Sequence, residues 1–178
     1  MFKEPEALRH ILGGTTLYHA LDVGSRAPVK LPQQMKPATM PGLQGEDLAP
    51  FLYYLREENP DRYETIIDTL KSAFRDFETL NFPPVAAGML TVTWKDRNFQ
   101  KPLYLNELSE GTLRFLWLVS LLQSPVLPAV TMIDEPEVSL HPELLAILAD
   151  VVRGAAKRTQ LIIATHSDRL IRYMQPSE

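Results

Sequence analysis

The sequence predicts an α/β fold in which helices flank a mostly parallel sheet. The apolar runs at residues 129–133 and 160–165 have the length of buried strands, and segments with helical periodicity lie before, between and after them. Strands that are apolar throughout and alternate with helices indicate a parallel sheet with both faces covered. The chain has 178 residues, 45% hydrophobic and 22% charged, which fits a single domain over residues 1–178.

The first part of the chain is expected to be irregular. Glycine and proline recur through residues 1–45 and interrupt every long element, so we expect loops there, with one short strand near residues 16–20. Residues 46–105 are expected to hold helices and a hairpin. The first of these helices is expected over about residues 47–58.

A second helix and the hairpin complete this segment. The helix is expected to begin at Pro60, with Asn59 as its cap. Its apolar residues recur at steps of three and four, which predicts one buried face: Tyr63, Ile66, Ile67, Leu70, Phe74 and Phe77. Residues 89–94 alternate as a strand does, and a polar turn leads into a second strand ending near Leu105.

The remaining segment, residues 106–178, is expected to form the core of the fold. It contains the two apolar strands and three helices, one capped by Ser109, one opened by Pro142 and a last one capped by Asp168. This order of helix, strand, helix, strand and helix is what predicts the parallel sheet.

Composition and charge exclude several classes of protein. With 22 acidic and 18 basic side chains the net charge is -4, so no basic field attracts nucleic acid, and without cysteine there is no disulfide framework. The N-terminus lacks the features of a signal peptide, so a cytoplasmic protein is expected. Residues 115–133 carry no charge, but Gln123, Pro125 and Pro128 interrupt them, and we expect no membrane span.

Two carboxylates directly follow the first apolar strand. Asp134 and Glu135 stand where parallel sheets bind ligands, at the carboxyl ends of the strands. In nucleotide hydrolysis one such carboxylate can hold Mg²⁺ and its neighbour can polarise the attacking water. The alternative from the residues alone is structural, because an acidic pair also suits a turn or a helix start.

Two further features complete a candidate site. Ser109 and Gly111 lie at the expected start of a helix, where free backbone N–H groups favour an anion and glycine permits its close approach. His166 follows the second apolar strand, so its imidazole could bond a terminal phosphate or the attacking water. A plain capped helix and a surface histidine are the structural alternatives.

These motifs, in this order, resemble those of ABC-type ATPases. Residues 108–112, LSEGT, resemble the signature motif, and residues 130–135 resemble the Walker B strand. Residues 139–142, SLHP, resemble the D-loop, and residues 165–167, THS, resemble the switch-histidine segment. The whole pattern is most similar to the C-terminal half of predicted ATPases of the AAA family, grouped near SMC and RecF proteins.

The resemblance implies an ATPase that uses ATP and Mg²⁺ and works as a head-to-tail dimer. Within one domain it implies Asp134 as the metal ligand and Glu135 and His166 as the catalytic residues. It also implies a nucleotide-contacting set that faces the partner's ATP and the dimer interface: Ser109, Glu110, Gly111 and Ser139. Glu110 stands where transporter ATPases usually have a second glycine, so a transporter subunit is disfavoured. Arg114 is expected to pair with a carboxylate or a phosphate-side group, with a solvated helix residue as the alternative, and His141 is expected to serve the interface or the fold.

One element of the ATPase pattern is absent from the sequence. No Gly-x-x-x-x-Gly-Lys-Ser/Thr string occurs, and the closest glycine cluster, at residues 13–16, lacks the lysine. We therefore interpret the chain as a fragment that needs a P-loop-bearing segment and expect it to be inactive alone, with DNA a partner only through other domains.

Two other functions stay open at this point. One is a non-catalytic interaction module with a vestigial nucleotide site. The other is a metal-dependent hydrolase that uses Asp134, Glu135, His141 and His166 as ligands.

Overall fold

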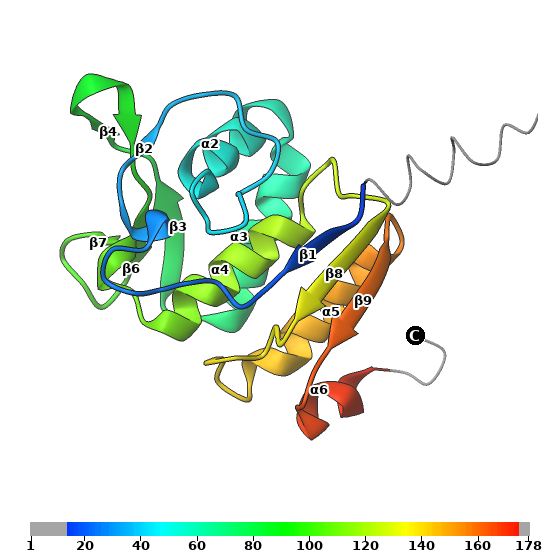
Figure 1. The fold of residues 1–178 in the computed structure, drawn as a ribbon. Helices are drawn as coiled ribbons and strands as arrows, with labels where there is room; N and C mark the ends of the chain where they lie inside the picture. Colours follow the sequence, from blue (N-terminus) through cyan, green and yellow to red (C-terminus); the bar gives the residue numbers. More distant parts are fainter. Residues whose placement is uncertain (1–13, 175–178) are drawn as a thin grey trace, which may run out of the picture.

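A computed structural model describes residues 14–174 and contains the parallel sheet that the sequence predicts (Figure 1). Its strands are β1 (Thr16–Tyr18), β8 (Val130–Asp134) and β9 (Gln160–Ala164), in the order β1-β8-β9, and both pairings are parallel. The α/β fold class is therefore confirmed, as is the strand expected near residues 16–20. The first thirteen residues of the expected irregular segment lie outside the described part.

Two helices cover one face of this sheet. They are α4 (Glu110–Leu122) and α5 (Leu144–Ala156), and in Figure 1 α5 lies behind β8 and β9. Trp117 of α4 packs edge-on against Tyr18 of β1, with ring centroids 6.0 Å apart. The uncharged run at residues 115–133 is thus divided between α4, a loop and β8. Within residues 14–174, no helix combines the length and apolar character that a membrane crossing requires.

Within residues 14–174 the opposite face of the sheet is open, which differs from the expectation of a sheet covered on both sides. The register pairs Leu17 with Met132 and Met132 with Ile162, so these apolar side chains form one row across three strands. Leu17 is 43% exposed and Ile162 45% exposed. No helix among the described residues covers this row (Figure 1). Its apolar character is that of a sheet interior, although it faces outward.

Helices α2 (Leu48–Glu58) and α3 (Pro60–Ala73) pack beside α4. Both were expected, although the Asn59 side chain makes no capping hydrogen bond. The apolar face of α3 is buried up to Leu70, but the helix ends before Phe77. Phe77 instead begins a strand and packs against Trp94, with ring centroids 4.3 Å apart. The apolar spacing of three and four continues past the end of α3 because the helix and the strand that begins at Phe77 pack into the same hydrophobic core.

Two small antiparallel sheets complete the α2–α3 side of the molecule. One has the order β3-β6-β7, and the other has the order β2-β5-β4. The hairpin expected near residues 89–105 is present as β6 and β7, but its first strand is shorter than predicted because Met89 and Leu90 belong to the other sheet. The strands are β2 (Gln33–Gln34), β3 (Phe77–Asn81), β4 (Pro84–Val85), β5 (Met89–Leu90), β6 (Thr93–Asp96) and β7 (Leu103–Tyr104). Short 3₁₀ turns occur at Pro28–Lys30, Ala86–Gly88 and Leu105–Glu107.

Two expected helix starts are displaced. Helix α5 begins at Leu144, and Pro142 lies in the turn before it. The last helix, α6 (Asp168–Tyr173), is capped by Ser167, whose hydroxyl accepts a hydrogen bond from the backbone N–H of Leu170. Asp168 is therefore the first residue of the helix, where its negative charge interacts favourably with the helix dipole.

Burial of Tyr63 on α3 gives the stability a dependence on alkaline pH. Desolvation raises the pKa of the Tyr63 phenol from 10.0 to about 12, and the nearby Arg56 guanidinium partly offsets this rise. The unfolded chain therefore ionises first, so the stabilising contribution is complete below pH 10.0 and is lost as the pH rises to about 12.

We expect the free energy of unfolding to fall more steeply over this range in the wild type than in Tyr63→Phe. Urea unfolding at several pH values measures both slopes. Equal slopes would show that Tyr63 does not carry the effect.

Candidate functional site at the carboxyl edge of the parallel sheet

The predicted carboxylates and histidine meet at the carboxyl edge of the parallel sheet. The backbone N–H of Glu135 donates to the Ala164 carbonyl over 2.8 Å, which extends the β8–β9 ladder by one residue. Glu135 Oε1 and His166 Nε2 then lie 3.9 Å apart, and both side chains reach solvent, at 45% and 93% exposure. Adjacent parallel strands bring their C-terminal ends together, so this proximity follows from the sheet topology.

The segment that follows β8 is a tight loop with two residues in the left-handed region. We refer to residues 135–140 as the carboxylate loop. Its Glu135 has φ 49° and its Ser139 has φ 63°. Two consecutive turns hold the loop. The backbone N–H of Val138 donates to the Glu135 carbonyl, and that of Leu140 donates to the Glu137 carbonyl. Positive φ costs energy for residues with a Cβ and concentrates at functional sites.

His19 is a site residue that the sequence analysis missed. It follows β1, and its Nδ1 lies 3.3 Å from Oδ2 of Asp134. The His19 side chain is 66% exposed and that of Asp134 is 46% exposed. The strand expected near residues 16–20 includes His19, but the observed strand β1 ends at Tyr18, which places His19 at the carboxyl edge of the sheet. The sequence did not show that β1 pairs with β8, since their partners are more than a hundred residues apart.

The N-terminus of α4 begins as predicted. The Ser109 hydroxyl accepts a hydrogen bond from the backbone N–H of Thr112 over 3.1 Å and lies 2.7 Å from the Thr112 hydroxyl. Ser109 and Glu110 are both exposed. The carboxylate of Glu110 stabilises the helix end, and it carries the same sign of charge as a phosphate approaching that end.

Gly111 is needed by packing against the carboxylate loop. A Cβ at this position would stand 2.4 Å from the carbonyl oxygen of Ser139, well inside van der Waals contact. From the sequence, this glycine is expected to permit the close approach of a phosphate. The contact between α4 and the carboxylate loop is a sufficient reason for it.

Arg114 holds three segments together, which corrects its expected pairing with a carboxylate or a phosphate-side group. Its Nε donates to the Leu21 carbonyl over 3.1 Å. Its Nη1 lies 2.8 Å from the Ser139 hydroxyl and 3.4 Å from the Val138 carbonyl. The side chain therefore connects α4, the segment after β1 and the carboxylate loop.

Arg114→Lys is expected to lower the free energy of unfolding by about 1–2 kcal/mol. A single ammonium group cannot reach Leu21 and Ser139 together as the planar guanidinium does. Urea unfolding monitored by circular dichroism measures the change. The matched control is Arg169→Lys on the exposed surface of α6, where the effect should stay within about 0.5 kcal/mol. Equal losses in both variants would contradict the proposed bridging contribution.

Glu137 is a second residue that the sequence analysis did not assign. Its Oε1 accepts hydrogen bonds from the Thr165 hydroxyl over 2.5 Å and from the His166 backbone N–H over 3.2 Å. Its Oε2 is buried and has no partner among the described residues. Glu137 thus joins the carboxylate loop to residues 165–167, which we call the histidine loop.

The arrangement gives no support to a transition-metal hydrolase. Within residues 14–174, no group of three or more histidine or acidic side chains is placed to hold a metal ion. His141 is 69% exposed and lies beside Glu143, its Nδ1 3.8 Å from Oε2. Asp134 retains an accessible carboxylate, which fits Mg²⁺, because that ion commonly takes one or two protein carboxylates and completes its shell with phosphates and water.

Comparison with solved structures identifies the fold. An SMC ATPase studied for ATP-driven dimerization and DNA-stimulated activation matches with a TM-score of 0.52 and 13% identity, covering 69% of this chain and 77% of that chain. The Smc head domain of Pyrococcus yayanosii gives a TM-score of 0.54 at 13% identity, covering 75% and 26%. An Smc head bound to the C-winged helix domain of ScpA gives 0.51 at 13%, covering 90% and 49%. The chain thus spans half or less of the latter two proteins.

Sequence comparison supplies the family. No curated protein matches the chain significantly. Residues 7–172 match the family described as "AAA domain, putative AbiEii toxin, Type IV TA system". Because this match covers most of the chain, the chain belongs to this AAA-domain family, and its fold is similar to that of SMC head domains.

Proposed function

We propose that this chain supplies the signature and Walker B half of an ATP-hydrolysing domain. A P-loop-bearing segment and head-to-tail dimerisation would complete that domain. The observation that carries the proposal is the 3.9 Å separation of Glu135 and His166 at the ends of adjacent strands. A base for the attacking water and a hydrogen-bond donor for the terminal phosphate are needed at one place in ATP hydrolysis.

Each residue at this edge has a role in the proposal. Asp134 holds Mg²⁺, which neutralises developing charge on the phosphates when bound. Glu135 orients and polarises the water, from a position 3.9 Å from His166. His166 donates a hydrogen bond to the terminal phosphate or to the water. His19, beside Asp134, limits where that carboxylate can lie.

The partner's nucleotide is proposed to meet the start of α4. Ser109, Glu110 and Ser139 are exposed, and the free N–H groups of α4 favour an anion. Packing of Gly111 against Ser139 places the helix start and the carboxylate loop on one surface. Contact between this surface and a second copy would bring each ATP between two domains.

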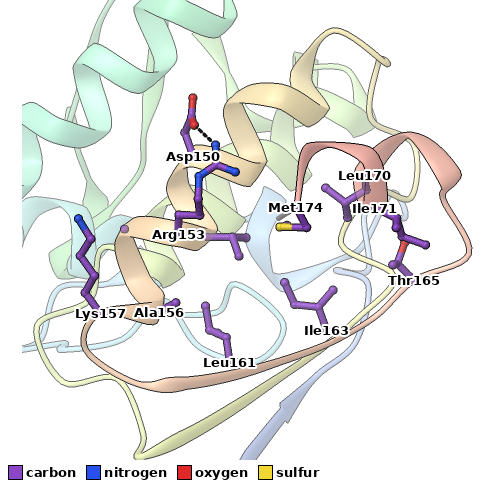
Figure 2. A pocket seen from close by; sticks show the side chains of 12 residues that line it. Asp150, Arg153, Ala156, Lys157, Leu161, Ile163, Thr165, Leu170, Ile171 and Met174 are labelled. Carbon is purple, nitrogen blue, oxygen red and sulfur yellow. Dashed lines mark hydrogen bonds and ion pairs between the residues drawn. The ribbon is translucent and has the colours of Figure 1, made fainter. Parts of the chain in front are cut away.

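The outer edge of β9 supports the need for a further segment. Its outer edge is unpaired among the described residues, and its apolar run would suit a central strand. A groove of about 840 Å³ lies beside it, between β9, α5 and α6; Figure 2 shows the side chains that line this groove. Apolar side chains line the groove: Leu161, Ile163, Leu170, Ile171 and Met174. A further strand with helices on both sides would cover the groove and the open row around Met132.

The test is to combine the chain with a P-loop-bearing segment of the same family and measure ATP hydrolysis. We expect Mg²⁺-dependent activity, which Glu135→Gln abolishes because the amide cannot act as a base. The control is Glu143→Gln, a carboxylate that is 89% exposed outside the carboxylate loop. The isolated chain should not bind ATP tightly, since no P-loop lysine is present.

Two results would contradict the proposal. Full activity after substitution of Asp134, Glu135 and His166 would favour a non-catalytic module with a vestigial site. Micromolar ATP binding by the isolated chain would remove the need for a P-loop segment. We also propose a cytoplasmic location. We propose that contact with DNA occurs only through attached domains, because the chain has a net charge of -4.

A further inference from the structure

We infer that Glu137 is the positioning residue for His166. Its carboxylate joins the carboxylate loop to the histidine loop and fixes the backbone from which the imidazole projects. The catalytic part of this inference rests on the proposed function, whereas its structural part does not.

The need for such a residue follows from the exposure of His166. With 93% of its side chain exposed, packing cannot orient the imidazole. Its ring lies 3.9 Å from Glu135, a long distance for an ion pair between two solvent-exposed groups, which contributes little. The position of the ring must therefore be set through the backbone of the histidine loop.

Glu137 supplies that backbone restraint. One carboxylate oxygen accepts from the Thr165 hydroxyl and from the N–H of His166. The Thr165 hydroxyl oxygen also accepts from the N–H of Ser167 over 3.0 Å. Ser167 in turn caps α6. A continuous chain of hydrogen bonds thus runs from Glu137 to the start of α6.

The same restraint reaches α4. Glu137 lies in the carboxylate loop between Glu135 and Ser139, and Ser139 is held by Arg114 and packed against Gly111. A shift of the α4 N-terminus would therefore be passed through this short loop to the histidine loop. The structure assigns to one carboxylate the connection between the signature helix and His166.

The first test needs no nucleotide. In the ¹⁵N-labelled chain, Glu137→Ala should raise the water-exchange rate of the His166 amide about tenfold, while Glu137→Gln, which keeps an acceptor oxygen, should leave it within about twofold. Amides of Met132 and Ile162 in the strands report on global stability and should not change. The matched control is Glu143→Ala, which removes an exposed carboxylate outside the loop.

Each outcome decides the structural part. An unchanged His166 amide in folded Glu137→Ala overturns the inference, and so does an equal change throughout the strands, which would indicate general destabilisation. If Glu137→Ala does not fold, Thr165→Val and Thr165→Ser replace it. The valine variant should raise exchange at His166 and the serine variant should not, and identical behaviour overturns the inference.

The second test uses the complete ATPase formed with a P-loop-bearing segment. Glu137→Ala should lower kcat with little change in KM, and Glu137→Gln should restore most of the loss. Failure of the wild type to hydrolyse ATP would defeat the proposed function and leave the amide result standing. A normal kcat in Glu137→Ala, together with a released His166 amide, would overturn the catalytic part alone.

Discussion

Replacing Gly111 by alanine is expected to lower the free energy of unfolding by about 2 kcal/mol. The new Cβ would stand 2.4 Å from the Ser139 carbonyl oxygen and 3.4 Å from its carbonyl carbon. Both are backbone atoms, so no side-chain rotation relieves the overlap. Helix α4 and the carboxylate loop would have to separate, which also strains the bond from Arg114 to Ser139. Urea unfolding of the isolated chain measures the loss.

The matched control is the same substitution in the other helix of this layer. A Cβ at Gly154 of α5 would meet no atom within 4 Å. Gly154→Ala should therefore stabilise the chain by about 0.5–1 kcal/mol, because alanine loses less backbone entropy in a helix. The two substitutions are expected to have opposite signs. A stabilising Gly111→Ala would show that α4 and the loop are not in close contact.

Truncating Trp117 to alanine is expected to cost about 3–5 kcal/mol. Its side chain is 1% exposed and packs edge-on against Tyr18. Its indole N–H donates to the Gly42 carbonyl over 3.0 Å. The residue therefore attaches α4 both to β1 and to the segment before α2, and its removal leaves a large cavity between them.

Trp117→Phe separates packing from hydrogen bonding. Phenylalanine keeps an aromatic ring against Tyr18 but leaves the Gly42 carbonyl without its donor, so a loss of about 1–2 kcal/mol is expected. Urea unfolding of both variants, with near-UV circular dichroism as a check of the fold, gives the two values. If phenylalanine were as costly as alanine, the hydrogen bond and not packing would dominate.

The core of the sheet could be predicted because its signals are local. The apolar strands β8 and β9 and the Ser109 cap are each visible within a few residues, and the order of elements gives the parallel topology. From that topology the meeting of Glu135 and His166 follows. Their catalytic roles stay a prediction until hydrolysis is measured.

What the sequence did not predict depends on contacts between distant segments. His19 reaches Asp134 only because β1 pairs with β8, and pairing across that distance leaves no local pattern. Glu137 lies in a turn, where an acidic residue is ordinary, and its partners follow another strand. Two-residue strands such as β2 (Gln33–Gln34) and β5 (Met89–Leu90) are too short to show alternation.

The edge of β9, which pairs with no strand of residues 14–174, has a practical consequence for anyone preparing this chain. A strand with free N–H and C=O groups along its side, and with Ile162 half exposed beside them, is a template for self-association. Copies in concentrated solution can add to one another there, and aggregation would then grow with storage time and protein concentration. A lysine in place of Ile162 would place a charge in that edge and keep the purified chain dispersed.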